Sequence, residues 1–523
     1  MRRFNILSLI AAALLTPAVG VAAPVVGVAT GKLEGVADAG VESFKGIPFA
    51  APPVGELRWR APQPAAAWNG VRSAKAFGHD CMQQPFAGDD APLTTTPAED
   101  CLYLNVWRPA GAQGKKLPVL VWIYGGGFIN GGSSPDIYQG TPFARDGIVY
   151  VSFNYRVGRF GFFGFPELSR QDADRGLLGN YGYMDQLAAL KWVQANIAAF
   201  GGDPAQVTVF GESAGGGSVN FLLTSPLSQG LFARAVVQSD GAGRGNRTGS
   251  PDLRQDHARR PSSETLGLRF AARMGIAGSD AKALAALRAL PADKVTDGLN
   301  LAAWSEDAGG PMIDGRLVAE EAWMVHAAGR QAKVPLMIGA NSDDVGNARA
   351  RTKDQAFAGF GDDVGKARAA YDLDGNKTLA RLNAEIGMDR TMVEPARFVA
   401  AAFAQQGLAS YEYRFSYTAT PRRAKSPYGA PHATEIPFVM DTVGARYGDS
   451  ATAQDLAMAK TMHAYWLNFA KTGNPNGPGL PSWPAYAPAK DWIMDFSADG
   501  KATPQADPWK ARLDATAAAA RRP

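Results

Sequence analysis

Ser213 stands between small residues in the stretch TVFGESAGGGSV, residues 208–219, directly after a run of strand-forming residues. A serine hydroxyl is a weak nucleophile unless a base lies within hydrogen-bond reach, a third group orients that base, and donors stabilise the oxyanion. The pattern G-x-S-x-G recurs by chance, and a plain glycine-rich turn would need the same small residues. Here it joins a strand pattern to a helix pattern, which favours a sharp turn that presents Ser213 as a nucleophile. In such a turn, side chains at 211 or 215 would collide with their neighbours.

The base must be one of five histidines, and their surroundings in the sequence differ. His432 lies in a turn late in the chain, Gly429-Ala430-Pro431-His432, just before EIPFVM. Loops at strand ends are where this kind of fold carries a base, so His432 is the candidate. The other four lie in helical patterns, beside a cysteine or in a basic polar loop: His326, His463, His79 and His257.

The acid that orients the base is expected between residues 213 and 432, after a strand, in the chain order nucleophile, acid, histidine. The segment PLMIGANSDDVG, residues 335–346, places Asp343 and Asp344 directly after a strong strand pattern. Either could be a solvated turn carboxylate, so the residues alone leave both candidates open.

A glycine-rich turn supplies candidate oxyanion donors. Tyr124-Gly125-Gly126-Gly127-Phe128 follows an apolar strand pattern, and backbone N–H groups there can point at an oxyanion, together with the N–H of Ala214. The alternatives are a flexible turn or a phosphate-binding loop. The second is disfavoured because no Gly-Lys-Ser/Thr follows.

The elements that must position these residues follow an α/β pattern. Apolar, β-rich runs suit strands of a largely parallel sheet that is buried on both faces, and a helical pattern over 183–201 lies between two of them. Such alternation predicts helices on both sides of the sheet. The start of the mature chain predicts an antiparallel hairpin, and helical insertions at about 243–334 and 363–407 are expected over the strand ends, where α/β folds place ligands. The predicted strands are 118–124, 148–156, 206–211, 234–239, 335–340 and 410–417.

The N-terminus has the layout of a secretory signal peptide. MRRFNILSLIAAALLTPAVGVAA begins with two arginines and continues with an apolar run too short to span a membrane, followed by small residues near Ala23. We therefore expect a signal peptide at 1–23, a single domain over 24–523, and a secreted or periplasmic protein without a stable membrane anchor. Removal of Arg2 and Arg3 would lower the formal net charge from +4 to +2, which gives no reason to expect a nucleic-acid partner.

Export also bears on the only two cysteines, Cys81 and Cys101. In an oxidising compartment, two cysteines twenty residues apart predict a disulfide rather than two unrelated thiols.

Several long segments resemble the type-B carboxylesterase/cholinesterase family of α/β-hydrolases, and the likeness covers nearly the whole mature chain. The matching segments are FKGIPFAAPPVGELRW, EDCLYLNVW, VWIYGGGF, GNYGYMDQLAALKWVQANIAAFGGDP, VTVFGESAGG, HATEIPF and YWLNFAKTGNPNG. The resemblance implies the α/β-hydrolase fold and supports pairing of the two cysteines.

The resemblance also implies roles for single residues. Ser213 would be the nucleophile, His432 the base, and the amides of Gly126, Gly127 and Ala214 the oxyanion donors. The family acid is usually the Glu of G-x-N-x-D-E-G, a position that Asp344 occupies here as the shorter residue. Glu212, beside Ser213, matches a family carboxylate that shapes the electrostatics of the site. It would equally fit a glutamate whose hydrogen bonds are made at the start of a helix.

Two departures from the family bear on the substrate. Choline-handling members carry a tryptophan between the two cysteines, whereas residues 82–100 contain Phe86 as their only aromatic residue and lack the apolar helical face of a lipid-binding lid. A choline ester and emulsified triglyceride are therefore disfavoured, and small soluble esters are favoured. Where family members often continue Gly-Ser after the pair Gln238-Ser239, this chain has Asp240-Gly241.

The sequence also carries three weaker patterns. An arginine-rich stretch over 244–260 would attract anionic esters if it bordered the site, but a solvated insertion is the simpler interpretation. DLDGNKTLARLN (372–383) is similar to a calcium-binding loop, but its glycine comes two positions early and its last residue, Asn383, replaces the expected Glu. It is therefore interpreted as an ordinary loop. Asn246 and Asn376 begin glycosylation acceptor sequences, used only in a host that glycosylates.

The sequence therefore predicts a secreted serine carboxylesterase that needs no cofactor or metal and forms an acyl-enzyme on Ser213. Its partner would be a small-molecule ester, and neither the natural ester nor the oligomeric state follows from the sequence. The alternatives are an acyltransferase or an amide or carbamate hydrolase of the same fold, and a non-catalytic binding protein, which would typically lack the nucleophile.

Overall fold

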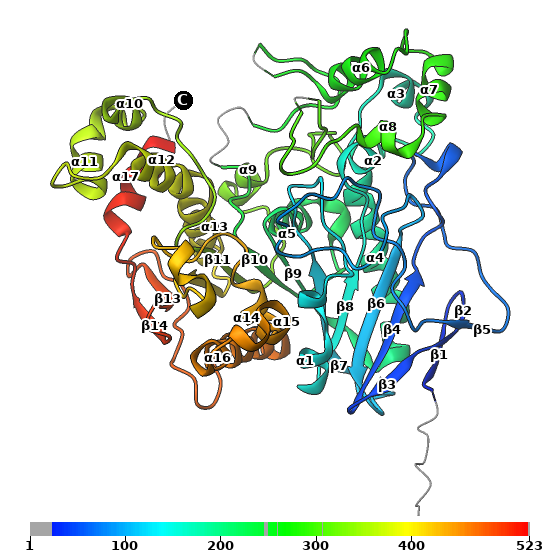
Figure 1. The fold of residues 1–523 in the computed structure, drawn as a ribbon, viewed down its shortest axis with the longest axis horizontal. Coiled ribbons are helices and arrows are strands. Elements are labelled where there is room, and N and C mark those ends of the chain that lie inside the picture. The colour runs from blue at the N-terminus through cyan, green and yellow to red at the C-terminus, as the bar shows by residue number, and fades with distance from the viewer. Residues whose placement is uncertain (1–22, 245–248, 259, 306, 521–523) are drawn as a thin grey trace, which may run out of the picture.

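The apolar, β-rich runs of the sequence form one mixed sheet of eleven strands (Figure 1). The computed structural model describes residues 23–244, 249–258, 260–305 and 307–520, so the predicted signal peptide lies outside the described residues up to residue 22. In spatial order the strands are β14 (Ala502–Ala506), β13 (Trp492–Phe496), β12 (Ser410–Phe415), β11 (Leu336–Asn341), β10 (Arg234–Gln238), β9 (Gly202–Glu212), β7 (Leu117–Ile123), β8 (Val149–Phe153), β6 (Tyr103–Pro109), β4 (Val41–Pro48) and β3 (Val36–Asp38).

The centre of this sheet is parallel, from β8 through β7, β9, β10, β11 and β12 to β13, and its two margins are antiparallel. Every residue of β8, β11 and β12 is buried, as expected for strands covered on both faces. All six predicted strands are present. The unpredicted β13 and β14 follow a Pro-rich stretch and extend the sheet at its C-terminal edge.

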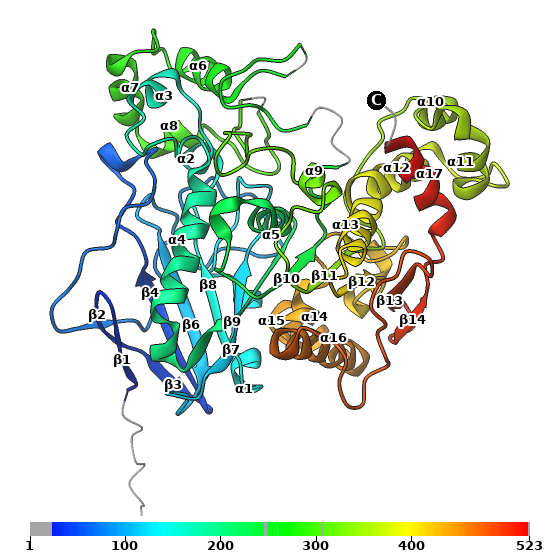
Figure 2. The same ribbon diagram turned by 180° about the vertical axis from the view of Figure 1, so that it is seen from behind.

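Helices cover both faces of the sheet. Contacts with its strands place α4 (Tyr181–Asn196), α5 (Ala214–Thr224) and α13 (Glu394–Gln405) on one face and α16 (Ala453–Thr472) on the other. Figure 1 shows α16 in front of the sheet, and Figure 2 shows α4 in front when the molecule is seen from behind. The chain therefore has the α/β architecture that its alternating pattern predicted.

Two helical stretches are inserted between central strands. Between β10 and β11 lie α6 (Ser263–Arg273), α7 (Ala281–Arg288), α8 (Ala292–Thr296) and α9 (Ala322–Ala327), and between β11 and β12 lie α10 (Lys353–Ala358), α11 (Val364–Tyr371) and α12 (Leu379–Met388), followed by α13. The second stretch begins with α10, ten residues before its expected start at 363, because Thr352 caps this short helix by accepting a hydrogen bond from the N–H of Gln355.

The N-terminal part forms the expected hairpin, in which β1 (Val25–Val28) pairs antiparallel with β2 (Gly31–Glu34). A third strand, β5 (Val71–Ser73), completes this small sheet. The predicted disulfide joins Cys81 to Cys101, and both residues are buried. None of the described helices has the length and apolar content that crossing a bilayer requires.

Candidate active site

Ser213 occupies a single-residue turn between β9 and α5. Its backbone has φ 57° and ψ −124°, a conformation that side chains rarely adopt and that costs roughly 1–3 kcal/mol. Glycines on both sides allow this turn: a Cβ on Gly211 would lie 2.5 Å from the carbonyl oxygen of Gly215, and one on Gly215 would lie 2.0 Å from that of Ile123. The close approach of three backbone segments thus explains the glycines of the motif, as the sequence analysis expected.

Three side chains from distant parts of the sequence form one hydrogen-bonded chain. His432 Nε2 lies 2.9 Å from Ser213 Oγ, and His432 Nδ1 lies 2.6 Å from Asp344 Oδ1. Because a carboxylate can only accept, Nδ1 carries the proton toward Asp344 and Nε2 is free to accept the proton of Ser213. The chain can therefore remove a proton from the serine hydroxyl.

The two neighbouring aspartates of the 335–346 segment point to different partners. Asp344 is buried, and its oxygens accept hydrogen bonds from His432, from the hydroxyl of Ser239 at 2.7 Å and from the N–H of Asn341 at 2.9 Å. Although burial opposes its charge, His432 and these donors hold the pKa of Asp344 below its ordinary value. Asp343 instead forms an ion pair with Arg381 at 2.6 Å. The structure thus brings Asp344, and not Asp343, to His432.

The loop that carries His432 is fixed to the end of β11. The N–H of Asp343 donates to the carbonyl of Ala430 at 2.9 Å, and the N–H of Ala430 donates to Ser342 Oγ at 2.9 Å. The side-chain amide of Asn341 donates to the carbonyl of Pro431 at 2.7 Å. The segment that supplies Asp344 therefore also positions the imidazole.

The predicted oxyanion donors lie around the elbow. Gly126 and Gly127 both have positive φ, and within the described part of the chain their N–H groups have no hydrogen-bond partner. Ala214 is the first residue of α5, so its N–H has no acceptor within the helix. A Cβ on Gly125 would lie 3.0 Å from that of Ser213, which places this loop directly against the serine.

A second carboxylate stands beside the imidazole. Glu212 is buried, and its Oε1 lies 3.2 Å from His432 Nε2 without the geometry of a hydrogen bond. Burial raises the pKa of Glu212 well above its ordinary value, and the charge of His432 lowers it again. Burial also opposes the charge of His432, but Glu212 and Asp344 outweigh this effect and raise the pKa of the imidazole.

Sequence reasoning missed a buried network behind Ser213, His432 and Asp344. Glu435 accepts hydrogen bonds from Gln238 Nε2 at 3.0 Å and from Asn341 Nδ2 at 2.7 Å. Burial raises the pKa of Glu435. Ser239, which donates to Asp344, was also missed. All four residues lie at the ends of strands or in the quoted motif HATEIPF, so their places in the sequence were a usable signal.

The remaining histidines have structural partners. Two of them contact backbone carbonyls: His463 Nδ1 lies 2.8 Å from that of Val439, and His79 Nδ1 lies 2.8 Å from that of Thr96. The other two contact side chains: His326 Nε2 lies 3.1 Å from Asn220 Oδ1, and His257 forms an ion pair with Asp252. Within the described ranges, no group of three His, Cys, Asp or Glu side chains is arranged to hold a metal ion.

The arginine-rich stretch does not offer unpaired charges in its described part. Arg244 is paired with Glu394 at 3.0 Å, with 9% of its side chain exposed. Arg254 lies 3.7 Å from Glu264, and Arg260 lies 3.7 Å from Asp252. Arg247, Arg259 and Asn246 lie outside the described residues. Arg244 is thus a largely buried ion-pair partner, whereas Arg254 and Arg260 fit the interpretation of a solvated insertion with local ion pairs.

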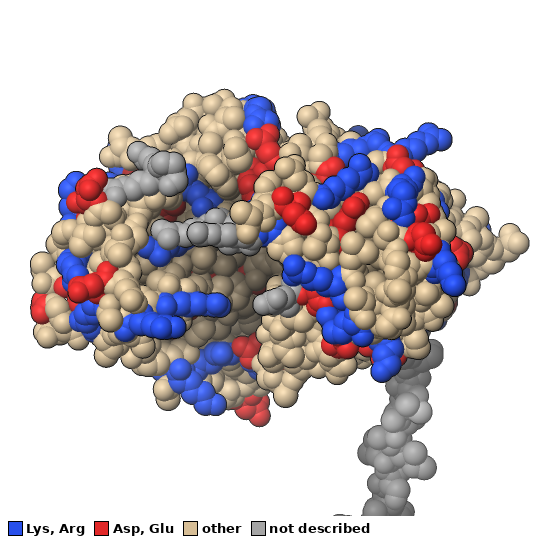
Figure 3. Space-filling view, turned by 90° about the horizontal axis from the view of Figure 1, so that it is seen from above, with Lys and Arg blue, Asp and Glu red and all other residues tan. Residues whose placement is uncertain are grey.

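The face seen from above is hollowed between the lobe of α10 to α12 and the lobe of α6 to α8, with basic side chains on both sides of the hollow (Figure 3). Two exposed apolar side chains lie over the oxyanion loop. A Cβ on Gly127 would meet Leu301 Cδ2 at 2.8 Å and Trp304 Cζ3 at 3.6 Å, and Trp304 is 60% exposed. An apolar surface is thus available to a substrate beside the oxyanion donors, which the sequence analysis did not anticipate.

Comparison with known proteins identifies the family. The model of the carboxylesterase family matches residues 22–513, nearly the whole chain. The chain belongs to the carboxylesterase family. A solved carboxylesterase of Geobacillus stearothermophilus is similar with a TM-score of 0.76 and 34% identity, over 94% of this chain and 99% of that one. The α/β-hydrolase fold implied by the sequence motifs is therefore confirmed.

Named relatives of this carboxylesterase are esterases. It is 36% identical to a fumonisin B1 esterase of Sphingopyxis macrogoltabida, over 89% of this chain and 85% of the relative. It is 35% identical to a para-nitrobenzyl esterase of Bacillus subtilis strain 168, over 87% of this chain and 91% of the relative. It is 33% identical to a human cocaine esterase, over 88% of this chain and 84% of the relative. Membership of this family makes the protein a carboxylic ester hydrolase.

The tight packing at the elbow yields a stability prediction. In Gly215→Ala, the new methyl group would overlap the carbonyl of Ile123, and we expect unfolding to become easier by about 3 kcal/mol, the upper range of overpacking. In Gly444→Ala, where no atom lies within 4 Å of the added methyl group, the change should stay below about 1 kcal/mol. Urea unfolding followed by tryptophan fluorescence measures both, and equal midpoints for the two variants would contradict the packing argument.

Proposed function

We propose that this carboxylesterase is an exported serine esterase that hydrolyses small soluble esters through an acyl-enzyme on Ser213. The observation that carries the proposal is the hydrogen-bonded chain from Ser213 through His432 to Asp344, with distances of 2.9 Å and 2.6 Å. A nucleophile, a base and an orienting acid in this arrangement support acyl transfer regardless of their order in the sequence.

In the first half of the reaction, Ser213 Oγ attacks the ester carbonyl while His432 Nε2 takes its proton. The carbonyl oxygen becomes an oxyanion, which the N–H groups of Gly126, Gly127 and Ala214 stabilise. Asp344 accepts the hydrogen bond of Nδ1 and stabilises the imidazolium that forms. When the tetrahedral intermediate collapses, the bond to the alcohol breaks, and His432 gives its proton to the leaving oxygen.

In the second half, water attacks the acyl carbon of the ester on Ser213, and His432 takes a proton from that water. Collapse of the second tetrahedral intermediate breaks the bond to Ser213 Oγ, which receives the proton back from His432. The products are the carboxylic acid and the regenerated serine. No group beyond the protein and water enters this balance.

Features of the sequence support the substrate class and the location. Residues 82–100 lack the tryptophan that holds choline and the apolar face of a lipid-binding lid, which favours small soluble esters. The basic and apolar start of the chain supports export, and the disulfide between Cys81 and Cys101 fits an oxidising compartment.

Removal of the nucleophile tests the covalent mechanism. With p-nitrophenyl butanoate, the wild type should release a burst of p-nitrophenol as Ser213 becomes acylated. Ser213→Ala should show no burst, and its kcat should fall on the order of 10⁵- to 10⁶-fold. Stopped-flow absorbance measures both quantities, and a burst in the variant would rule out Ser213 as the acylated residue.

The two aspartates provide a matched pair of variants. In Asp344→Asn, the amide cannot hold His432 in its productive tautomer, and kcat should fall on the order of 10³- to 10⁴-fold. In Asp343→Asn, only the ion pair with Arg381 is lost, so kcat should change less than about threefold. Steady-state hydrolysis of the same ester measures both, and equal losses would contradict the assigned acid.

The carboxylate of Glu212 predicts the pH dependence. Because neutral His432 is the active form and its pKa is raised above 6.5, kcat/KM should fall as the pH decreases, with a midpoint above 6.5. Glu212→Gln removes an anion beside the imidazole, so the midpoint should move to lower pH by about one unit or more. Asp343→Asn serves as the control with an unmoved midpoint. A pH profile of Glu212→Gln identical to the wild type would refute this electrostatic role.

A further inference from the structure

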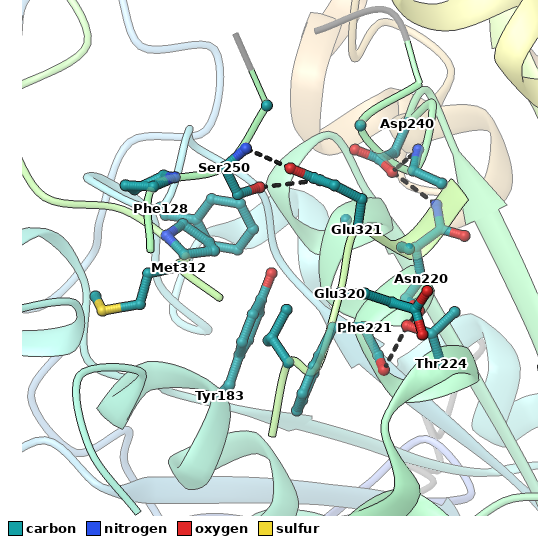
Figure 4. Close-up of a pocket in the computed structure, with 18 residues that line it drawn as sticks. Phe128, Tyr183, Asn220, Phe221, Thr224, Asp240, Ser250, Met312, Glu320 and Glu321 are labelled. Carbon is teal, nitrogen blue, oxygen red and sulfur yellow. Dashed lines mark hydrogen bonds between the residues drawn. The ribbon is translucent and has the colours of Figure 1, made fainter. Parts of the chain in front are cut away.

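A cavity of about 290 Å³ adjoins the elbow, and His432 is not among the residues that line it. Its wall includes Phe128, which follows the oxyanion glycines, and Gly217, whose N–H donates to the carbonyl of Ser213 at 2.8 Å. Gly217 is one helical turn along α5 from the nucleophile, about 6 Å. Figure 4 shows this cavity with its aromatic and acidic side chains.

The position of the cavity assigns it to one half of the ester. The leaving alcohol must receive its proton from His432 Nε2, so it lies on the imidazole side of Ser213. His432 does not line the cavity, whereas residues beside the oxyanion loop and the start of α5 do. The acyl group of a bound ester is therefore the part that can extend into the cavity.

Asp240 is the charged group of the cavity that is nearest to α5. Its Oδ1 accepts hydrogen bonds from Asn220 Nδ2 at 2.6 Å and from the N–H of Ala242 at 2.8 Å. A Cβ on Gly217 would lie 3.1 Å from Oδ2 and 3.4 Å from the ring of Phe128, which places Oδ2 at the cavity wall. Within the described residues, no Lys or Arg is bonded to Asp240, and burial raises the pKa of its carboxyl.

Asn220 is oriented so that it donates to Asp240. The imidazole of His326 is buried, which lowers its pKa to about 3 and keeps the ring neutral. Its Nε2 lies 3.1 Å from Asn220 Oδ1, and because an amide oxygen only accepts, Nε2 donates. The amide group of Asn220 therefore faces Asp240 with its N–H, and this arrangement favours the ionised carboxylate.

The other carboxylates at the cavity have partners of their own. Glu320 is paired with Arg330 at 2.6 Å, and Glu321 accepts hydrogen bonds from the N–H and the hydroxyl of Ser250. No lysine or arginine occurs among the described residues that line the cavity. The donors of Ser250 to Glu321 are neutral, as are those of Asp240, so it is the place of Asp240 beside Gly217, one helical turn from Ser213, that makes it the carboxylate for an acyl-chain cation.

The remaining wall is aromatic, and aromatic faces attract cations. The rings of Tyr183 and Phe221 are stacked with centroids 3.9 Å apart, and the ring of Phe128 meets Tyr183 edge to face at 5.7 Å. The hydroxyl of Tyr183 points into the cavity (Figure 4). A half-buried carboxylate with aromatic neighbours suits an alkylammonium group better than a neutral chain or an anion.

We propose that this cavity binds the acyl chain of esters that carry a protonated amine at the end of that chain, with Asp240 as the group that recognises the amine. The proposal rests on the proposed role of Ser213, because the cavity is assigned through its position beside the nucleophile. It concerns selectivity among esters and adds no chemical step to the reaction.

Ethyl esters of matched shape test the proposal. Ethyl 3-aminopropanoate is compared with ethyl butanoate and with the anionic monoethyl succinate, and ethyl 6-aminohexanoate with ethyl heptanoate, by pH-stat at pH 7. The wild type should prefer the amino ester over its neutral counterpart about tenfold or more in kcat/KM in at least one pair, and monoethyl succinate should be the poorest substrate. Equal values in both pairs would overturn the proposal.

Asp240→Asn separates recognition from the intrinsic reactivity of the amino esters. An ammonium group activates the ester by itself, so the deciding quantity is the change in the amino-to-neutral ratio between the wild type and the variant. The ratio should fall about tenfold in Asp240→Asn. The control Glu320→Gln removes a carboxylate of the same cavity that is paired with Arg330, and its ratio should stay within about threefold of the wild type. An equal fall in both variants would overturn the assignment to Asp240.

Two further measurements distinguish failure of the amine-binding proposal from failure of the proposed serine mechanism. If Asp240→Asn does not fold, inhibition of the wild type by pentylammonium should be at least tenfold stronger than inhibition by 1-pentanol, and equal inhibition would overturn the proposal. Hydrolysis of ethyl butanoate that is lost in Ser213→Ala supports the serine mechanism on its own. Failure of the amine preference alone would then leave the proposed function standing.

Discussion

The site depends on the close approach of three backbone segments at the end of β9. The carbonyl of Ile123, the strained turn at Ser213 and the first turn of α5 pack against one another without intervening side chains, which is why residues 211 and 215 are glycines. This packing holds the serine in a conformation that an isolated turn would leave. It also brings the glycine loop at Gly125 and the first residue of α5, Ala214, next to Ser213, so one constraint positions the candidate nucleophile and the candidate oxyanion donors.

The sequence predicts most of the fold because the buried parallel strands are continuous apolar runs, and it predicts the site because G-x-S-x-G and His432 lie in recognisable turns. The residues alone left Asp343 and Asp344 open, because two adjacent residues of a turn can point in different directions, and only the family resemblance favoured Asp344. The structure resolves their directions: Asp343 reaches Arg381, while Asp344 reaches His432. The network of Glu435, Gln238 and Asn341 was not predicted, because strand ends and the motif HATEIPF mark where its members lie but not that they meet in space.

Three buried carboxylates surround one imidazole, and their hydrogen bonds distinguish their roles. Asp344 accepts from a side chain, a hydroxyl and backbone N–H groups, and its pKa is lowered despite burial. Glu435 accepts from two amides, and Glu212 Oε1 has no hydrogen-bond partner within the described chain, so burial dominates and raises the pKa of both. Asp344, beside His432 Nδ1, can therefore stay ionised. The ionisation of Glu212, beside Nε2, depends on whether His432 carries its second proton.

The two residues that follow β10, Ser239 and Asp240, contact different parts of the site. Ser239 has φ 49°, so the chain turns there, and its hydroxyl holds Asp344 while the next side chain, Asp240, reaches the cavity wall. Asp240 has its own anchors in Asn220 and the N–H of Ala242, and none of these bonds involves Ser239. If the cavity binds the acyl chain as proposed, a change at residue 240 would alter which acyl groups fit while the partners of Asp344 stay in place.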